Sequence, residues 1–431
     1  MKLNYKRTFL IGLAFMSICA FWQLYDYVVP LILQYTFQFE EGVTGVVMAM
    51  DNLLALFLLP LFGSLSDRTS TPLGRRTPFI IAGTAVAAVC MLILPIADDT
   101  RNLPLFIGML ALVLFAMASY RSPAVALMPD LTPKPLRSSG NAVINLMGAL
   151  GGIFTFIITG TLLPHLNTET GEKDGSYFTV YAILAGFMAA AVIILVATVR
   201  EKKLAAEMPA EEEDEEDKAA AAGKGKKLAP EVRRSLIFIL LSVACWYIAY
   251  NAITSAYSRY VMEVWGATEK DGSNMMLVAT VVTTISYIPI GIISSKIGRK
   301  KMILCGVSLM ALSYLGGFFL TSPGVLIYVI MGLIGIGWAA INVNSYPMVV
   351  EMSSGADVGR YTGIYYTFSM SAQTVTPILS GFLIQFLGYR VLFPYAVFFS
   401  LVALVTMWQV RHGDARPTAK EHVLEYLGSD D

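Results

Sequence analysis

Residues 60–80 read Pro60-Leu-Phe-Gly63-Ser-Leu-Ser-Asp67-Arg68-Thr-Ser-Thr-Pro-Leu-Gly74-Arg75-Arg76-Thr-Pro78-Phe-Ile80, a short charged loop between two apolar runs. The flanking runs, Val43–Leu65 and Pro78–Ile96, are long enough to cross a hydrocarbon layer of about 30 Å. A similar loop, Gly291-Ile-Ile-Ser-Ser-Lys296-Ile-Gly298-Arg299-Lys-Lys301, separates two later apolar runs. The recurrence predicts a membrane protein built from two similar halves.

Apolar runs of this length recur along the whole chain, six before and six after a long polar stretch. Lipid offers no hydrogen-bond partner to the backbone, so each run must be a helix. We therefore expect an all-α membrane protein with twelve transmembrane helices in two pseudo-symmetric six-helix bundles. The predicted spans are Thr8–Tyr35, Val43–Leu65, Pro78–Ile96, Pro104–Met128, Asn141–Leu163, Tyr177–Val199, Ser235–Tyr260, Asn274–Ser295, Met302–Leu320, Gly324–Val350, Tyr361–Leu387 and Val391–Val410.

The same pattern divides the chain into four parts. Residues 1–199 form the first bundle, 200–234 a charged linker, 235–410 the second bundle and 411–431 a tail. The linker holds an acidic block, Glu211–Asp217, and a basic group, Lys224–Lys227, so we expect a flexible tether. With the N-terminus inside, 25 of the 31 Lys and Arg residues fall on the inner side. The positive-inside rule then predicts that both termini are cytoplasmic. We expect the protein to lie in the cell (plasma) membrane.

Composition excludes several classes of protein. Hydrophobic residues make up 56% of the chain and charged residues 14%, against about 25% charged in soluble proteins. A net charge of zero argues against a nucleic-acid partner. The four Cys lie in apolar runs and the three His have no ligand-spaced partners, so we expect neither a metal site nor a cofactor. No phosphate-binding loop or nucleophile set is visible, which argues against an enzyme.

The two charged loops occupy matching places after the second helix of each half. Asp67 can accept hydrogen bonds from the start of a facing helix or pair with Arg, and the Gly residues permit tight turns. Ion pairs that form in one conformation and break in another would act as a latch for alternating access. The predicted cytoplasmic latch comprises Gly63, Asp67, Arg68, Gly74, Arg75, Arg76, Asp130, Arg137, Gly291, Lys296, Gly298, Arg299, Glu351 and Arg360.

The pattern Gly63-x-x-x-Asp67-Arg68…Gly74-Arg75-Arg76 resembles the loop signature of the major facilitator superfamily. The longer stretch from Pro60 to Ile80, with Pro123-Ala-Val-Ala-Leu-Met-Pro-Asp130-Leu131 and Asn141-Ala142, resembles the sucrose/proton symporters and the glycoside–pentoside–hexuronide:cation symporters. The resemblance implies secondary transport of a sugar. The chain departs from these families at their coupling positions, which fall on Leu114, Val125, Ala55 and Leu59, so their coupling chemistry cannot be carried over.

Two carboxylates lie inside predicted spans. Asp26 and Asp51 fall about 14 and 12 Å from the outer helix ends, at similar depth. A charge there costs at least about 2.5–3.5 kcal/mol, so each is a functional candidate. Burial disfavours the charged form of a carboxylate, and we expect Asp26 or Asp51 to bind the coupling proton, with Na+ as the alternative ion. The alternative role is a structural Asp bonded to Tyr or to the backbone.

Two arginines also lie within the spans. Arg121 is about 10 Å from the cytoplasmic end, too low to pair with either Asp in straight helices. It could bind a substrate carboxylate or an acidic neighbour. Arg259 lies near an outer helix end with Glu263 four residues on, which predicts an i,i+4 pair at the interface.

Polar and aromatic side chains follow single faces of four predicted helices, where a sugar could bind. Amides and carboxylates satisfy hydroxyl groups, and Trp or Tyr can stack on the apolar faces of a sugar ring. Hydrogen bonding between helices is the alternative use of such residues. The substrate-binding candidates are Trp22, Gln23, Tyr25, Asp26, Asn52, Arg121, Tyr247, Asn251, Trp338, Asn342, Tyr366 and Gln373.

These observations predict a monomeric secondary transporter in a lipid bilayer that moves a di- or oligosaccharide with protons by rocking of the two halves. One alternative is an exporter of amphiphilic drugs, which would need a more apolar cavity. A non-transporting membrane sensor or scaffold is an alternative of a different class, and it would not need paired intramembrane Asp residues.

Overall fold

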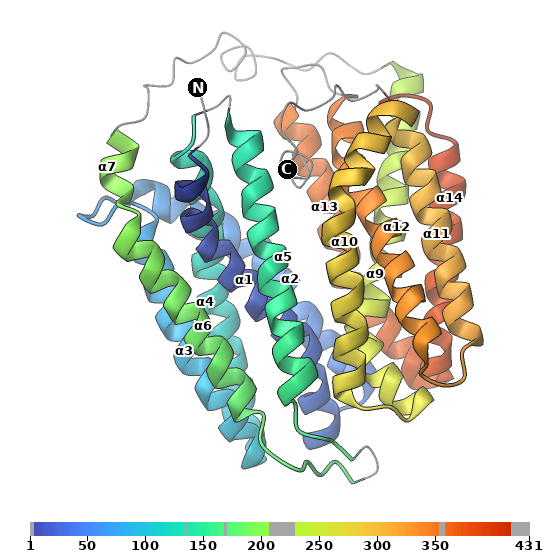
Figure 1. Ribbon diagram of the computed structural model, residues 1–431, viewed down its shortest axis with the longest axis horizontal. Coiled ribbons are helices and arrows are strands. Elements are labelled where there is room, and N and C mark those ends of the chain that lie inside the picture. Colours follow the sequence, from blue (N-terminus) through green and yellow to red (C-terminus); the bar gives the residue numbers. More distant parts are fainter. Residues whose placement is uncertain (1–3, 134–135, 168–169, 207–228, 353–357, 415–431) are drawn as a thin grey trace.

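The computed structural model describes residues 4–133, 136–167, 170–206, 229–352 and 358–414, without the side chains of 137–139 and 358–360. Twelve helices in this described part are long and apolar enough to cross a membrane. They form two groups of six that lie side by side (Figure 1). The prediction of an all-α membrane protein with twelve spans is confirmed.

The first six spans form the N half. Their bounds fall within a few residues of the predicted ones, and several ends are extended by polar residues that satisfy exposed backbone groups. Asn4 and Asn102, for example, each accept a backbone N–H at 3.1 Å at a helix start. The helices are α1 (Tyr5–Leu31), its π-helical continuation η1 (Ile32–Thr36), α2 (Glu41–Arg68), α3 (Thr77–Asp99), α4 (Leu103–Asp130), α5 (Arg137–Leu162) and α6 (Phe178–Thr198).

The remaining six spans form the C half. Its first helix begins five residues before the predicted span, at Pro230, a residue that suits the first turn of a helix. A capping box of Thr268 and Asp271 starts the next helix. The helices are α9 (Pro230–Trp265), α10 (Glu269–Ile297), α11 (Arg299–Phe319), α12 (Val325–Val350), α13 (Val358–Leu387), the 3-10 turn η4 (Tyr389–Val391) and α14 (Leu392–Trp408).

The predicted linker is ordered at both of its edges. Residues Glu201–Ala206 form the short helix α7, and residues 230–234 belong to α9. The expectation of a wholly flexible 200–234 segment is therefore wrong at these edges, because Glu201 is buried and hydrogen-bonded there. Residues 207–228, with the acidic block, lie outside the described residues, as does the tail beyond Asp414.

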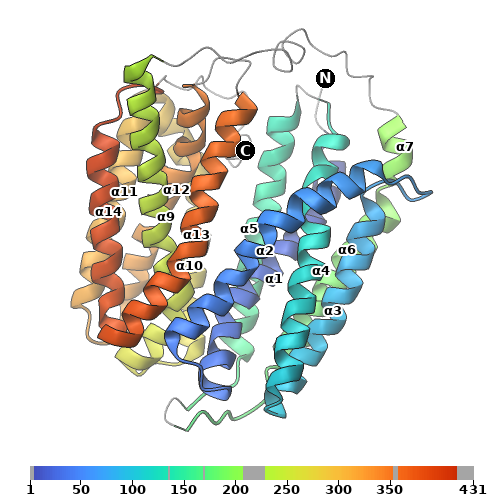
Figure 2. The ribbon, with the colours of Figure 1, turned by 180° about the vertical axis from the view of Figure 1, so that it is seen from behind.

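The start of α1 and the end of α14 lie at the same end of the bundle, which we call the terminal face; the other end is the opposite face (Figure 1). The halves meet through α2 with α13 and through α5 with α10. At Gly45 of α2 an added Cβ would lie 2.0 Å from the carbonyl oxygen of Pro377, so only Gly permits this approach. The halves converge toward the opposite face and diverge toward the terminal face in both ribbon views (Figures 1 and 2).

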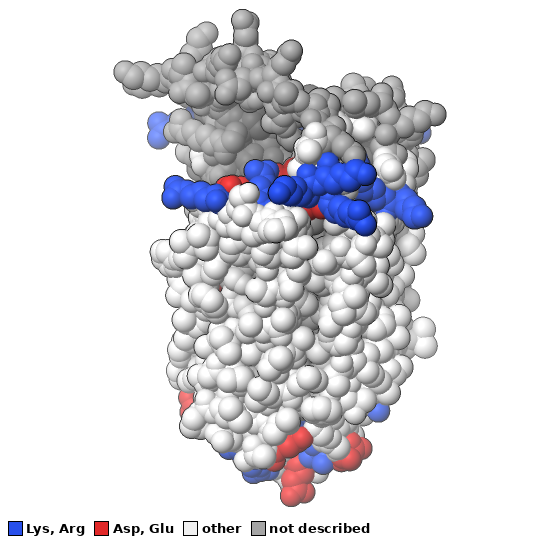
Figure 3. Space-filling view, turned by 90° about the vertical axis from the view of Figure 1, so that its left-hand side faces the viewer, with Lys and Arg blue, Asp and Glu red and all other residues white. Residues whose placement is uncertain are grey.

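Charge divides the surface as a bilayer would require. The side formed by α3, α6 and α7 shows a broad uncharged band with a belt of Lys and Arg at the terminal end (Figure 3). A smaller group of mixed charges marks the opposite end. This distribution is that of a multi-pass membrane protein.

Candidate functional site

The two intramembrane carboxylates lie near each other on α1 and α2. Asp26 is exposed and Asp51 is half-buried, although each lies inside an apolar helix. Asp26 interacts electrostatically with Asp51, and the neighbouring Asn52 donates its side-chain amide to Asp51 Oδ1 at 2.8 Å. A carboxylate inside an apolar span is costly, so the pair marks a candidate functional site.

Arg121 of α4 joins this group. Its guanidinium lies over the ring of Trp22, with Cζ 5.7 Å from the ring centroid, a cation–π arrangement. It interacts electrostatically with Asp26 and Asp51. Among the described side chains it makes no ion pair within 4.0 Å, so the Arg121 charge acts on both carboxylates without neutralising either one directly.

Aromatic rings surround Trp22 on α1. Tyr25 meets the Trp22 ring edge-on at 5.4 Å, and Phe21 meets it at 5.2 Å. Within the described part, Trp22 Nε1 and Tyr25 Oη have no hydrogen-bond partner although both atoms are buried. Gln23 lies against Gly152 of α5. Two unpartnered donors beside a carboxylate group can bind hydroxyl oxygens.

The candidates of the C half form an aromatic cluster. Tyr250 of α9 stacks on Trp338 of α12, with ring centroids 3.7 Å apart and an interplanar angle of 2°. Tyr247 meets Trp338 edge-on at 5.3 Å. One face of Trp338 is therefore covered, which leaves at most the other face for a sugar. The Asn251 amide donates to the carbonyl of Tyr247 at 2.8 Å.

The remaining C-half candidates lie on α12 and α13. Asn342 and Gln373 are half-buried. Tyr366 packs against Tyr346 and Tyr365, with centroids 6.2 and 5.6 Å away. The structure thus brings the charged candidates together with Trp22 in the N half, and it brings Tyr247 together with Trp338 in the C half.

The N-half loop forms a compact network at the terminal face. Arg76 pairs with Asp130 at 2.8 Å and with Asp67 at 2.5 Å, and Arg75 also pairs with Asp130 at 2.8 Å. Burial opposes the charge of Arg76, but these carboxylates outweigh burial and raise the pKa of Arg76 above its ordinary value. Asp67 thus takes the second of its two predicted roles, pairing with Arg. Gly63 lies against Ser122 of α4.

A carboxylate that sequence reasoning missed holds the start of α3. Glu201 of α7 is 3% exposed and accepts the backbone N–H groups of Arg75, Arg76 and Thr77 at 2.8–2.9 Å, with the Thr77 hydroxyl at 2.6 Å. The carboxylate also complements the positive end of the helix dipole. Glu201 replaces Asp67 in the first predicted role, and no local pattern pointed to it.

The C-half loop repeats this design with other residues. Arg299 pairs with Glu351 at the end of α12, the counterpart of Asp130 at the end of α4. Asp414, which follows α14, accepts the backbone N–H of Lys300 at 2.8 Å. Gly74 and Gly298 lie in the two loops with positive φ angles of 122° and 96°.

Other members of the predicted latch contribute less. Arg68 and Lys296 are exposed, and Gly291 is buried within α10. The side chains of Arg137 and Arg360 lie outside the described residues. The described ion pairs of the latch residues lie within one half or the other, so in this conformation they do not join the halves.

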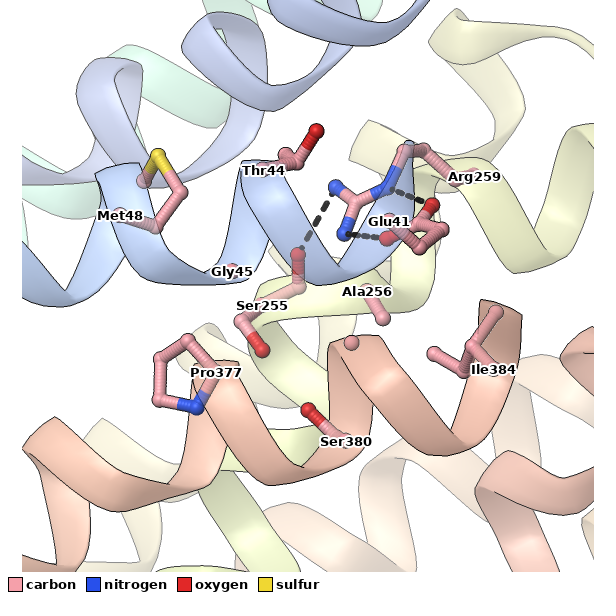
Figure 4. Close-up of a pocket in the computed structure, with 11 residues that line it drawn as sticks. Glu41, Thr44, Gly45, Met48, Ser255, Ala256, Arg259, Pro377, Ser380 and Ile384 are labelled. Atoms are coloured by element: carbon pink, nitrogen blue, oxygen red, sulfur yellow. Dashed lines mark hydrogen bonds and ion pairs between the residues drawn. The ribbon is translucent and has the colours of Figure 1, made fainter. Parts of the chain in front are cut away.

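The opposite face carries a buried ion pair between the halves, shown in Figure 4. Arg259 of α9 donates to both carboxylate oxygens of Glu41 of α2, at 2.8 and 3.3 Å, and the two side chains are 5% and 6% exposed. Tyr389 also donates to Glu41 and accepts from Gln34 at 2.6 Å. The adjoining cavity measures about 10 Å³, near the minimum for one water.

The predicted pair of Arg259 with Glu263 is wrong. Glu263 instead accepts the hydroxyl of Tyr35 from the N half at 2.5 Å. Further bonds join the halves nearby: Leu166 N to Glu269 Oε1 at 2.7 Å, and Thr159 to Ser273 at 2.5 Å. A tertiary partner outcompetes the local one because Glu41 offers Arg259 a two-pronged contact away from water. We call the group Glu41, Arg259, Tyr35, Glu263 and Tyr389 the opposite-face gate.

Two bundles of six helices, an intramembrane charged group and a gate between the halves define a membrane transporter of the major facilitator type. The family model described as MFS/sugar transport protein matches residues 10–408. The chain belongs to this family, whose fold is that of transporters and not of enzymes.

Curated relatives match parts of the chain. Sequence identity is 27% over 210 residues to an uncharacterised MFS-type transporter of Mycobacterium tuberculosis, covering 47% of this chain and 29% of that protein. It is 30% over 146 residues to proton-associated sugar transporter A of Homo sapiens, covering 31% and 19%. It is 29% over 120 residues to sucrose transport protein SUC3 of Arabidopsis thaliana, covering 23% and 20%. The chain thus matches less than a third of the length of each of these relatives.

Solved transporters share the fold across the whole chain. A mutant of the nucleoside transporter NupG matches with a TM-score of 0.68 and 14% identity, covering 94% of this chain and all of that one. The xylose transporter XylE from E. coli, in an inward-open conformation, matches with a TM-score of 0.63 and 14% identity, covering 98% of both chains. At these identities the likeness shows the fold alone.

Proposed function

We propose that the protein is a secondary active transporter that moves a di- or oligosaccharide together with protons across the cell membrane, as a monomer with both termini in the cytoplasm. The observation that carries the proposal is the charged group of Asp26, Asp51 and Arg121, which interact electrostatically within apolar helices. Sugar-transporting relatives support the substrate class, and two of them are named for protons or sucrose.

The proposed chemistry follows from the charges. Two carboxylates near each other in surroundings poor in water cannot both ionise at low cost, so one of them takes up a proton. Arg121 favours the ionised form of the other carboxylate. The proton would then reside on Asp26 or Asp51, and proton binding would be linked to substrate binding through shared hydroxyl contacts.

The proposed substrate contacts come from both halves. Trp22 Nε1, Tyr25 Oη and the amides of Gln23, Asn342 and Gln373 would bind hydroxyls, and the aromatic cluster at Trp338 would contact a sugar ring. Contact with both halves would let the substrate stabilise the closed intermediate through which the halves rock.

With cytoplasmic termini, the opposite-face gate would lie on the extracellular side. The Glu41–Arg259 pair would then close the outer entrance, and its rupture would be part of each transport cycle. The charged networks of the terminal face, which lie within each half here, would be free to re-form between halves when the inner entrance closes.

The test is transport by the full chain in proteoliposomes against a panel of sugars, with external pH recorded. Sugar-dependent alkalinisation is the expected result. Asp26→Asn or Asp51→Asn should abolish pH-driven accumulation while sparing exchange of sugar for sugar, because exchange needs no net proton movement. Glu231→Gln, an exposed carboxylate at the start of α9, is the matched control.

Three results would each overturn one part of this proposal. Unchanged accumulation in both Asp variants would remove the carboxylates from coupling. Accumulation that follows a sodium gradient and does not depend on pH would show that the coupling ion is Na+ and not the proton. Transport of amphiphilic cations instead of sugars would show that the proposed substrate class is wrong.

A further inference from the structure

A groove of about 600 Å³ lies at the terminal face between the start of α3 and the end of α6. Its apolar wall is formed by Leu73, Val196 and Ala197, and its rim by Arg200, Lys202 and Lys203. We call it the α3–α6 groove. It lies on the outside of the N half, away from Asp26 and Asp51, and the proposed transport cycle does not use it.

The groove lies where the bilayer ends. The span of α6 stops at Thr198, and the three cations follow within five residues. Leu73 is 50% exposed and Ala197 is also exposed, so the apolar wall faces the lipid. Figure 3 shows the belt of Lys and Arg directly above the uncharged band on this side. An apolar wall that leads to cations at headgroup depth matches a phospholipid, with its acyl chain below and its phosphate above.

The charge of the rim is one-sided. Arg200 and Lys202 are exposed and make no ion pair within the described part of the chain. The acid between them, Glu201, is buried, and its carboxylate oxygens are occupied by the start of α3. The rim therefore presents positive charge, which complements a phosphate.

We propose that the α3–α6 groove binds the phosphate of an anionic phospholipid from the leaflet at the terminal face. Arg200 and Lys202 contact the phosphate, and the wall of Leu73, Val196 and Ala197 holds the first part of an acyl chain. The bound lipid also holds α7 in place, and with it Glu201 on the backbone of residues 75–77. The lipid thereby supports the charged network of the N half.

Two other basic grooves allow binding at the α3–α6 groove to be distinguished from a general attraction of anionic lipid to basic surfaces. One of about 370 Å³ at the start of α9 is lined by Arg233 and Arg234, and one of about 530 Å³ is lined by Lys296 and Lys301. Arg233 and Arg234 supply two cations at the same face, and the described residues that line their groove include no carboxylate. They are the matched control for Arg200 and Lys202.

The experiment is native mass spectrometry of the purified full chain titrated with phosphatidylglycerol or with phosphatidylcholine of the same acyl chains. Phosphatidylglycerol should bind in preference. Arg200→Gln with Lys202→Gln should weaken this binding about 30-fold, as expected for two interfacial cations. Arg233→Gln with Arg234→Gln should change it far less. Size-exclusion profiles of both double variants verify that they fold.

Hydrogen exchange locates the lipid on the same samples. Phosphatidylglycerol should protect backbone amides of 71–79 and 199–206 and leave those of 230–238 unchanged. Equal binding of the two lipids, equal losses in the two double variants, or protection at 230–238 alone would overturn the proposal. Displacement of the lipid by inorganic phosphate at millimolar concentration would show that the rim binds a free anion, and this result would also overturn the proposal.

Discussion

The two faces of the bundle use charge in different ways. At the terminal face the described ion pairs stay within a half: Arg76 with Asp130 and Asp67, and Arg299 with Glu351. At the opposite face the pair of Arg259 with Glu41 crosses from one half to the other, as does the bond of Tyr35 to Glu263. The first kind of contact fixes the shape of each half, and the second sets how the halves sit together.

The difference has a physical basis. A contact within a half can persist while the halves rock, so it adds to stability in every conformation. A contact between halves is lost when that face opens, so it biases the equilibrium between conformations by its own free energy. Substitutions at the opposite face should therefore change the balance between conformations. Substitutions at the terminal face should instead change the stability of the protein.

The largest effect is expected at the opposite-face gate. Arg259→Gln leaves the Glu41 carboxylate buried without its partner, at a cost of about 3–5 kcal/mol to the closed arrangement. The conformation should shift toward opening at this face. The measurement is labelling of Thr44→Cys, a position that is fully buried beside the pair, by an impermeant maleimide after replacement of the four native Cys.

The control for this prediction removes both partners. Arg259→Gln with Glu41→Gln leaves no buried charge, so labelling of Thr44→Cys should fall between that of the parent and that of the single variant. Equal labelling of the single variant and the parent would show that the pair does not hold the face closed.

The next effect is expected at the terminal face. Glu201→Ala leaves the backbone N–H groups of residues 75–77, at the start of α3, without their acceptor, and we expect a loss of about 3 kcal/mol of stability. The melting temperature in detergent should fall, while labelling of Thr44→Cys stays unchanged. Increased labelling would contradict the assignment of this contact to a single half.

A smaller loss is expected at the matching position of the C half. Asp414 is exposed and accepts a single backbone N–H in the described part, so Asp414→Ala should cost about 1 kcal/mol. The comparison of its melting temperature with that of Glu201→Ala measures how unequal the two networks are. A loss as large as that of Glu201→Ala would show that burial does not control the strength of the contact.

The smallest effect is expected from Glu263→Gln. The amide oxygen can still accept the Tyr35 hydroxyl, and the exposed side chain loses little by giving up its charge, so we expect less than about 1 kcal/mol. Labelling of Thr44→Cys should rise only slightly. A rise equal to that of Arg259→Gln would move the main contact of the gate from Glu41 to Glu263.

The spans were predictable because length and apolarity are local properties. All twelve predicted spans coincide with helices to within a few residues, and the loop pattern at Gly74 and Gly298 marked both turns correctly. The exact ends of the helices were harder to predict, because capping residues such as Asn4 extend helices beyond their apolar runs.

The partners of charged residues were not predictable in the same way. Arg259 has an acid four residues away in the sequence, yet it pairs with Glu41, 218 residues distant. Glu201 lies in a stretch with the composition of a flexible linker, yet its side chain is buried against the start of α3. The depth estimate for Arg121 agrees with the absence of an ion pair to Asp26 or Asp51 among the described side chains, but it gave no sign that Arg121 acts electrostatically on both carboxylates.

The sequence by itself determined the number of spans, the division into halves and the presence of carboxylates within the membrane. These follow from the cost of placing backbone and charge in lipid, which each segment meets alone. Only the tertiary structure decided which charges meet, which face is closed and which carboxylate holds each loop. A charge selects its partner by distance and desolvation, and both are set by how distant helices pack.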